Sequence, residues 1–383
     1  MKFKYVALLF VVCLIPFMGY FLNPNLAFND SYAFLSSVCG VEDVGGDLGS
    51  FVFKDFLLPL FPCNVLFIKF VLFLTYFSCI LLIGLFAENI VGSGKGWKVA
   101  FVSATLSPLL FFEAMKFEND IFGWLFCLLG LWCISFLANG KVYSLSSKVL
   151  YTLVACVCLF FASLLYLPSV LIAVVYCFLV WWVVPIVIIP IMYVLNDAFV
   201  YLFLTNRGVS EEMIGYGLPW IVFLFPFIMD VPKKLRIPTI ILLIIGFFKT
   251  KFMFFVVPFL SFGVVEFYEK YKTERWCPNL FFVGFCFLFA YSFLAFTTSP
   301  TQSEMNQVSS SIVLANDLNV PLYNDWDLGW WVTFKGYPTI YKACFPDPDW
   351  NKLETPYVAL TRIDLNCEQV LLQDNKLKVF RCD

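Results

Sequence analysis

Carboxylates stand at two places where an apolar run of this sequence ends. Asp30 follows the first apolar run, and Lys116-Phe117-Glu118-Asn119-Asp120 separates the runs 97–115 and 121–138. Runs of about 20 apolar residues cross a bilayer, so these acids are expected at a membrane face, where carboxylates are costly to desolvate. Glu118 and Asp120 suit a hard cation with oxygen ligands. With Asp30 they predict a metal or sugar-phosphate site, in which Asp30 also serves as a general base.

These residues also have simpler structural interpretations. An Asp before an apolar run is a common helix N-cap, which applies to Asp30, and Glu118 and Asp120 would cap a helix that starts at Ile121. At another outer edge, Lys249 and Lys251 suit the phosphate of a lipid, but lysines there also snorkel to the interface. Both interpretations stay open at each place.

A third segment mixes aromatic and acidic residues near the C-terminus. It reads Asn324-Asp325-Trp326-Asp327-Leu328-Gly329-Trp330-Trp331. Aromatic rings stack on sugars and carboxylates accept hydrogen bonds from hydroxyls, so Asp325, Trp326 and Asp327 are candidates for acceptor binding. A tryptophan-rich packing seam is the alternative.

The composition is that of a polytopic membrane protein. Of 383 residues, 61% are hydrophobic and 14% are charged, against about 45–50% and 25% in soluble domains. The net charge of −2 argues against nucleic acid as a partner. The sequence has no histidine, which excludes histidine bases and histidine-ligated zinc and leaves carboxylates, amines, hydroxyls and a hard cation such as Mg²⁺ or Mn²⁺.

Apolar runs predict about eleven transmembrane helices. We expect the first run to be a retained span rather than a cleaved signal peptide, because it is long and no small-residue cleavage motif follows. The predicted spans are 5–22, 65–86, 97–115, 121–138, 149–166, 168–185, 187–204, 215–230, 235–248, 252–268 and 277–297. The count is least secure around 168–204 and 235–248.

Lysine and arginine bias places the N-terminus in the cytoplasm. With that orientation the inner loops hold most basic residues outside the C-terminal tail: Lys2, Lys4, Lys95, Lys98, Lys141, Lys148, Lys233, Lys234, Arg236, Lys270, Lys272 and Arg275. An odd number of spans then puts the C-terminal tail outside the cytoplasm, on the side of Asp30 and Glu118.

The polar tail predicts a small α/β domain. We expect a transmembrane domain over 1–297, with candidate catalytic loops 23–64 and 116–121, and an extracytoplasmic domain over 298–383. In the tail, a helix is expected at 309–319 and strands at 320–323, 330–334, 357–360 and 376–380. A disulfide between Cys367 and Cys382 is compatible with the sequence.

Several of these motifs resemble the GT-C superfamily of membrane glycosyltransferases, most sharply the oligosaccharyltransferase catalytic subunit. Asn29-Asp30-x-Tyr32-Ala33-Phe34 is similar to its first-loop catalytic motif, and Glu118-Asn119-Asp120 to its D-x-D or E-x-D metal motif. Trp326-Asp327-Leu328-Gly329 is similar to W-W-D-Y-G, although Asp325 replaces the first Trp and Leu328 the Tyr. The tail is far shorter than in oligosaccharyltransferases.

Two further segments carry the resemblance. Lys251-Phe252 is similar to an Arg-Phe segment whose cation meets the lipid phosphate, and Val209-Ser210-Glu211 loosely resembles an external-loop motif that ends in Glu. The resemblance implies a polyprenyl-phosphate-linked donor near Lys249 and Lys251, and an acceptor near Glu211.

The expected function is glycosyl transfer from a polyprenyl-phosphate or pyrophosphate donor on the non-cytoplasmic face. Asp30, Glu118 and Asp120 would hold Mg²⁺ or Mn²⁺, or would orient donor hydroxyls in a metal-free enzyme. The acceptor is a protein, as for an oligosaccharyltransferase, or a lipid-linked glycan or envelope polymer. A transporter or lipid flippase is the alternative outside this class, but no internal repeat is visible, and Asp197 is the only clear candidate for an ionisable group near the bilayer midplane.

Overall fold

The structure of the protein is a computed structural model that describes most of the chain. The described residues are 2–27, 29–41, 53–92, 94–105, 108–142, 144–183, 225–248, 255–271, 300–325, 328–335, 349–367, 369–373 and 377–382. The predicted spans 187–204 and 277–297, most of 215–230, and the predicted boundary at 297/298 lie outside this part.

Four helices are long and apolar enough to cross a membrane within the described residues. They are α1 (Phe3–Leu22), α3 (Val65–Val91), α6 (Asn119–Ala138) and α7 (Leu145–Leu165). Each coincides with a predicted span within a few residues, because a continuous apolar run is the strongest signal of a transmembrane helix. The chain is an integral membrane protein.

The described residues also form shorter helices. The predicted span 97–115 consists of two helices, α4 (Gly96–Thr105) and α5 (Pro108–Met115). Proline suits the start of α5 because the N–H groups of a helix's first turn have no partner within the helix, so the missing N–H of proline costs nothing there. The remaining helices are the 3₁₀ turns Leu167–Leu171, Trp181–Val183 and Phe225–Asp230, with α8 (Ile172–Leu179), α12 (Lys233–Phe248) and α13 (Val257–Tyr271).

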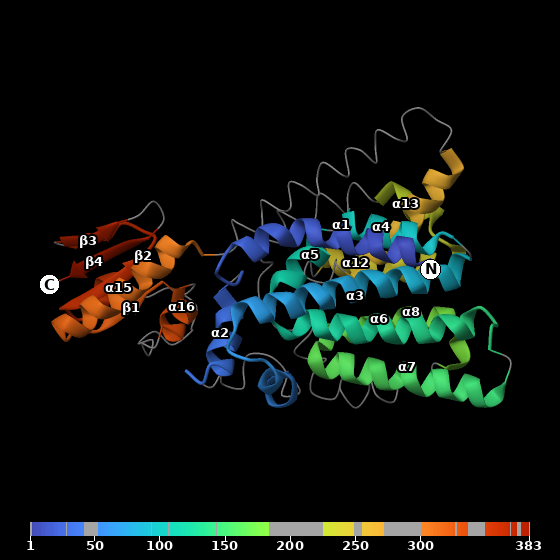
Figure 1. Cartoon of the computed structure of the whole chain (residues 1–383), viewed down its shortest axis with the longest axis horizontal. Helices are drawn as coiled ribbons and strands as arrows, with labels where there is room; N and C mark the ends of the chain where they lie inside the picture. The colour runs from blue at the N-terminus through green and yellow to red at the C-terminus, as the bar shows by residue number, and fades with distance from the viewer. Residues whose placement is uncertain are drawn as a thin grey trace.

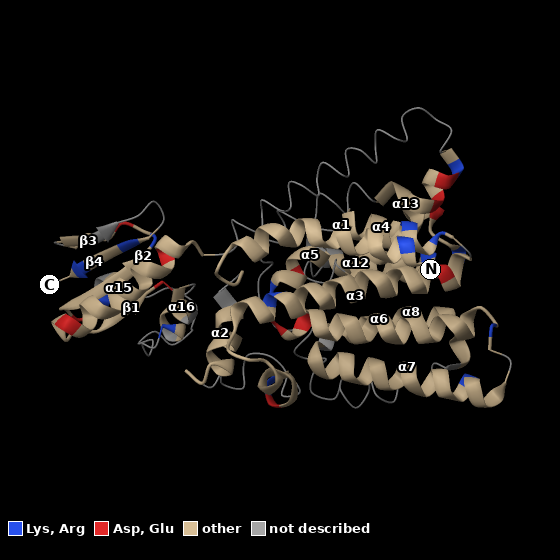
Figure 2. Ribbon diagram, viewed as in Figure 1, with Lys and Arg blue, Asp and Glu red and all other residues tan. Residues whose placement is uncertain are grey.

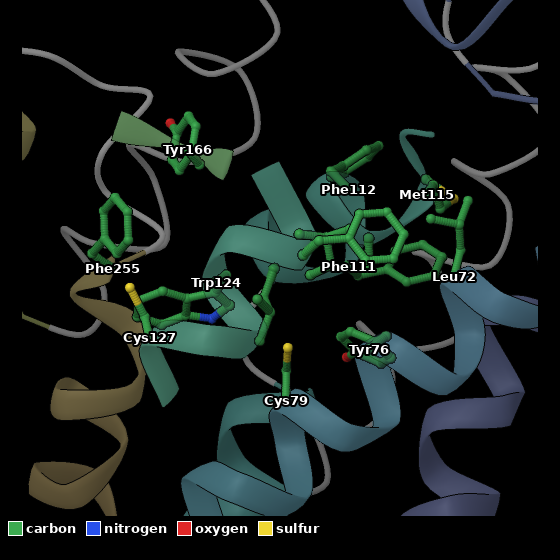
Figure 3. Packing of buried hydrophobic residues seen from close by; sticks show 14 of the residues in the cluster. Leu72, Tyr76, Cys79, Phe111, Phe112, Met115, Trp124, Cys127, Tyr166 and Phe255 are labelled. Atoms are coloured by element: carbon green, nitrogen blue, oxygen red, sulfur yellow. The ribbon is translucent and has the colours of Figure 1, made fainter. Parts of the chain in front are cut away.

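The bundle core is packed through aromatic rings and close backbone contacts. Figure 3 shows α3, α5 and α6 sending Tyr76, Phe111 and Trp124 into one buried cluster. At Gly123 of α6 a Cβ would stand 2.6 Å from the Cβ of Tyr166, so glycine lets these two segments approach.

Charged residues gather toward the two ends of the bundle (Figure 2). At the end that carries the N-terminus, Lys95 pairs with Glu266 at 2.7 Å, Lys98 pairs with Glu269, and Lys234 donates to the Ala138 carbonyl at 3.3 Å. These three lysines belong to loops that we assigned to the cytoplasmic side, and the structure places them at one end.

The first long loop folds over the other end of the bundle. It contains α2 (Asn29–Val38), a π-helical turn (Phe53–Leu57) and a 3₁₀ turn (Leu58–Leu60). A disulfide between Cys39 and Cys63 ties the end of α2 to the start of α3.

The C-terminal region lies beyond α2 (Figure 1). Helix α15 (Gln302–Leu318) begins with a capping box between Thr301 and Glu304 and packs on a four-stranded sheet of order β1-β2-β4-β3. The remaining elements are β1 (Leu322–Asn324), α16 (Gly329–Phe334), a 3₁₀ turn (Trp350–Lys352), β2 (Tyr357–Thr361), β3 (Gln369–Gln373) and β4 (Lys378–Cys382). Strands β1 and β2 are parallel, whereas β4 is antiparallel to both β2 and β3.

The tail predictions were partly right. Helix α15 starts seven residues before the predicted 309–319, where Thr301 and Glu304 cap it, and β1, β2 and β4 lie near predicted strands. The predicted strand 330–334 is wrong: these residues form α16, which packs on α2. Their aromatic and β-branched composition favours a strand, and tertiary contact overrides that preference. Strand β3 was missed, whereas the Cys367–Cys382 disulfide is present.

Candidate active site

The two acidic motifs come together at the bundle end that faces the C-terminal region. Asp30 is the second residue of α2, and Glu118 immediately precedes α6. The backbone N–H of Phe117 donates to the Ser31 hydroxyl oxygen at 2.9 Å, and both residues are buried. The segments that carry Asp30 and Glu118 are therefore adjacent, although the side chain of Asp30 lies outside the described part.

Aromatic rings pack around Phe117 and hold the contact between the two segments in place. The Phe117 ring packs edge-on against Phe61 at 5.1 Å, Phe53 at 6.1 Å and Phe34 at 6.4 Å. These partners come from α2 and from the turns before α3. The short turn 116–118 is thus fixed by a buried hydrogen bond and by rings from three segments.

Glu118 and Asp120 occupy the N-terminus of α6. Glu118 is the N-cap residue, with extended backbone, but its side chain does not bond the first turn of the helix. Asp120 lies in that turn and is 3% exposed. The Asn119 side chain instead donates to the Leu165 carbonyl and ties α6 to the end of α7. The structure therefore does not support simple side-chain capping by Glu118, and the helix begins two residues earlier than expected.

The donor chemistry at this end suits a hard cation. Carboxylate oxygens are the ligands that Mg²⁺ and Mn²⁺ prefer, and the positive end of the α6 dipole favours negative charge nearby. Among the described residues no three acidic, histidine or cysteine side chains group as a metal site. The third expected ligand, Asp30, has its side chain outside that set, so the metal site remains a prediction.

Sequence reasoning missed a buried carboxylate beside this turn. Glu113 of α5 is 1% exposed, and its Oε1 lies 3.4 Å from Lys116 Nζ. Its Oε2 has no hydrogen-bond partner in the described structure. A lone acid inside the apolar run 97–115, three residues before a lysine, was the available signal.

Lys69 is the second functional candidate that the sequence analysis did not single out. It lies in the first turns of α3, is 1% exposed, and its Nζ donates to the carbonyls of Tyr20 at 2.8 Å and Asn23 at 2.6 Å. Nζ also lies 4.3 Å from the centroid of the Tyr20 ring. A cation at the last carbonyls of α1 fixes the point where the chain leaves this helix toward α2.

Asp325 has a structural role in the sheet. Its Oδ1 accepts from the Thr361 hydroxyl and its Oδ2 from the Arg362 backbone N–H, both at 2.7 Å. We expected this carboxylate to bind an acceptor, but both of its oxygens are engaged within the protein. The expected site residues Glu211, Lys249, Lys251, Trp326 and Asp327 lie outside the described part.

Phe255, the first described residue after these lysines, contacts α6. Phe255, four residues after Lys251, packs edge-on against Trp124 of α6 at 4.7 Å (Figure 3). It also stacks on Tyr166 at 6.1 Å. Trp124 is four residues after Asp120, so Phe255 contacts α6 about one turn beyond the acidic residues.

Solved structures share the overall fold of this chain. ArnT from Cupriavidus metallidurans in the apo state aligns over 99% of this chain and 98% of its own, with 14% identity and a TM-score of 0.59. The same protein bound to undecaprenyl phosphate aligns over 100% and 98%, with 14% identity and a TM-score of 0.58.

An archaeal oligosaccharyltransferase shares the fold over a smaller part of its length. AglB from Archaeoglobus fulgidus, in complex with an inhibitory peptide and a dolichol-phosphate, aligns over 88% of this chain and 64% of its own, with 10% identity and a TM-score of 0.55. No protein-family model and no curated protein sequence matches the chain. At these identities the likeness shows the fold alone: this chain shares the fold of ArnT and of the archaeal oligosaccharyltransferase.

Proposed function

We propose that this protein is a membrane glycosyltransferase that uses a polyprenyl-phosphate-linked sugar donor. The observation that carries the proposal is the full-length likeness to ArnT, which has been solved with undecaprenyl phosphate bound. This likeness by itself shows only that the two proteins share a fold. The junction of the Asp30 and Glu118 segments, through Phe117 and Ser31, supplies a place for the chemistry.

In the proposed reaction an acceptor oxygen or nitrogen attacks the anomeric carbon of the donor sugar. The bond from that carbon to the phosphate oxygen breaks, and the phosphate leaves with the electron pair. Asp30 receives the proton of the acceptor, while Lys249 and Lys251 stabilise the charge that grows on the phosphate. Trp326 and Asp327 line the acceptor side, together with Glu211.

Glu118 and Asp120 would hold Mg²⁺ or Mn²⁺, with Asp30 as a third ligand. A cation there supplies charge stabilisation for the phosphate of the donor. Without a metal, the two carboxylates would orient donor hydroxyls. Their place at the N-terminus of α6, beside the segment of Asp30, is compatible with both roles.

The acceptor is on the non-cytoplasmic face in this proposal. The disulfides Cys39–Cys63 and Cys367–Cys382 lie in the first loop and the C-terminal region, at the end of the bundle that carries the acidic turn. Disulfides form in oxidising compartments outside the cytoplasm. The basic loops at the opposite end fit the cytoplasmic side.

A lipid-linked glycan or envelope polymer is the second candidate acceptor. The chain aligns with 98% of ArnT but with only 64% of AglB, so much of the oligosaccharyltransferase chain has no counterpart here. Asp325, which replaces a Trp of the acceptor motif, is engaged within the sheet. These two observations favour transfer to a glycan over transfer to protein asparagine.

The test is transfer of a radiolabelled sugar from undecaprenyl-phosphate donors in membranes. We compare the wild type with Asp30→Asn, and with Asp55→Asn as the matched control, because Asp55 is an exposed acid of the same loop. Loss of product in Asp30→Asn alone supports the proposal, and loss on EDTA that Mn²⁺ or Mg²⁺ restores supports the metal. Full activity of Asp30→Asn, or no transfer by the wild type with any donor, would contradict it.

A further inference from the structure

We propose that Trp331 is a positioning residue that holds α2, and with it Asp30, against the C-terminal sheet. The proposal rests on the proposed function, because it concerns the placement of the expected base. It assigns to the C-terminal region a role in orienting the active-site helix.

The first observation is the contact between α2 and α16. Tyr32, two residues after Asp30, is 1% exposed. Its ring meets Phe334 edge-on at 5.4 Å and Trp331 at 6.4 Å. Edge-to-face pairs of this kind stabilise a contact beyond the area that they bury, and they define the relative orientation of the two rings.

Tyr32 is also fixed from the side of the membrane bundle. Its hydroxyl oxygen accepts the backbone N–H of Leu26 at 3.2 Å, and Leu26 lies in the chain between α1 and α2. Burial raises the pKa of the Tyr32 phenol well above its ordinary range, so the hydroxyl stays protonated. Tyr32 therefore joins the chain that follows α1, the start of α2 and the C-terminal region at one point.

The second observation is the anchor on the other side of Trp331. The Arg362 guanidinium lies 5.8 Å from the centroid of the Trp331 ring, within the range of a cation–π contact. The backbone N–H of Arg362 donates to Asp325, which also accepts from Thr361 at the end of β2. Trp331 thus connects α2 to the end of β2, which is held in place by the two hydrogen bonds that Asp325 accepts.

Ring packing, rather than hydrogen bonding, carries this contact. Trp331 is 5% exposed, and its indole N–H has no hydrogen-bond partner in the described structure. A phenylalanine at this position keeps an aromatic ring, and losing the indole N–H breaks no hydrogen bond of the described structure. Trp331→Phe should therefore retain the function, whereas Trp331→Leu should not.

Loss of this contact would act on the reaction through geometry. Displacing a reacting group by about 1 Å costs on the order of 100-fold in rate, and Asp30 stands in the first turn of α2. We expect Trp331→Leu to lower kcat by at least about tenfold and to leave the KM for the donor within about twofold.

The experiment measures transfer and backbone hydrogen exchange on the full chain in nanodiscs. Trp331→Leu should lower kcat and speed exchange in α2, and Trp331→Phe should restore both. Trp350→Leu is the matched control: Trp350 packs against the sheet cluster of Tyr357, Ala359, Phe380 and Cys382, which contains no residue of α2. It should leave kcat and exchange in α2 unchanged.

A double-variant cycle tests the pairing. If Tyr32→Leu and Trp331→Leu disrupt the same contact, the double variant should be about as active as the less active of the two single variants. Multiplied losses, unchanged exchange in α2, or failure of Trp331→Phe to rescue would each overturn the proposal. If the wild type transfers no sugar, the proposed function fails, and the exchange measurements still decide the role of Trp331.

Discussion

The backbone N–H of Phe117 donates a 2.9 Å hydrogen bond to the hydroxyl oxygen of Ser31, 86 positions earlier in the chain. This bond joins the helix that begins beside Asp30 to the turn that leads into Glu118. The Ser31 hydroxyl is engaged in this bond, and the Phe117 side chain has no polar group. Their contact nevertheless holds side by side the two segments that carry Asp30 and Glu118.

We expect Ser31→Ala to reduce both stability and transfer. The substitution leaves the buried Phe117 N–H without an acceptor, which costs about 1–3 kcal/mol, and it loosens the acidic turn. Ser163→Ala is the matched control, since its hydroxyl only donates to the Leu159 carbonyl within α7 and its loss strands no donor. Thermal unfolding in detergent and the transfer assay measure the two effects. Equal behaviour of both variants would show that the bond is unimportant.

Lys69→Met should destabilise the junction between α1 and α3. It removes charged hydrogen bonds to the Tyr20 and Asn23 carbonyls, and such bonds contribute about 1.5–3 kcal/mol each. We expect a lower midpoint of thermal unfolding than for Lys233→Met, in which an exposed lysine at the other end is replaced. A midpoint equal to that of the control would mean that the hydrogen bonds of Lys69 to the end of α1 make no net contribution to stability.

The Glu113–Lys116 pair should show strong coupling. Lys116→Met would leave the buried Glu113 carboxylate uncompensated, at a cost of about 3–5 kcal/mol. Glu113→Gln removes that charge, so the double variant should recover most of the lost stability. Denaturation of the three variants measures the coupling, and additive losses would contradict it.

The disulfides provide a test of orientation. In intact cells, reduction with an impermeant phosphine should allow an impermeant maleimide to label Cys39, Cys63, Cys367 and Cys382. A Lys234→Cys variant carries a reporter at the opposite end, where Lys234 meets Ala138, and should gain label only after permeabilisation. The reverse pattern would place the acidic turn in the cytoplasm.

The disulfides should also stabilise the regions that they close. Replacing Cys367 and Cys382 by Ser opens a loop whose ends are 15 positions apart. Chain-entropy arguments assign about 3 kcal/mol to a loop of this length. Proteolysis of the C-terminal region with and without the bond measures the loss, and Cys158→Ser, a buried thiol of α7, is the control.

By itself, the sequence determined the class of the protein and most of its long helices. Continuous apolar runs made α1, α3, α6 and α7 predictable, because a helix is the conformation that satisfies its own backbone within a bilayer. The absence of histidine and the positions of Asp30, Glu118 and Asp120 pointed to carboxylate chemistry at one membrane face. These features depend on local composition, which a single sequence displays.

Only the tertiary structure decided which segments lie together and what supports them. The bond between Ser31 and Phe117, the two roles of Tyr32 in α2 and the burial of Glu113 depend on contacts between distant segments. For the same reason 330–334 became a helix against α2 although its composition favours a strand, and Asp325 turned inward to hold Thr361 and Arg362. Burial and long-range pairing select among conformations that local preference leaves close in free energy.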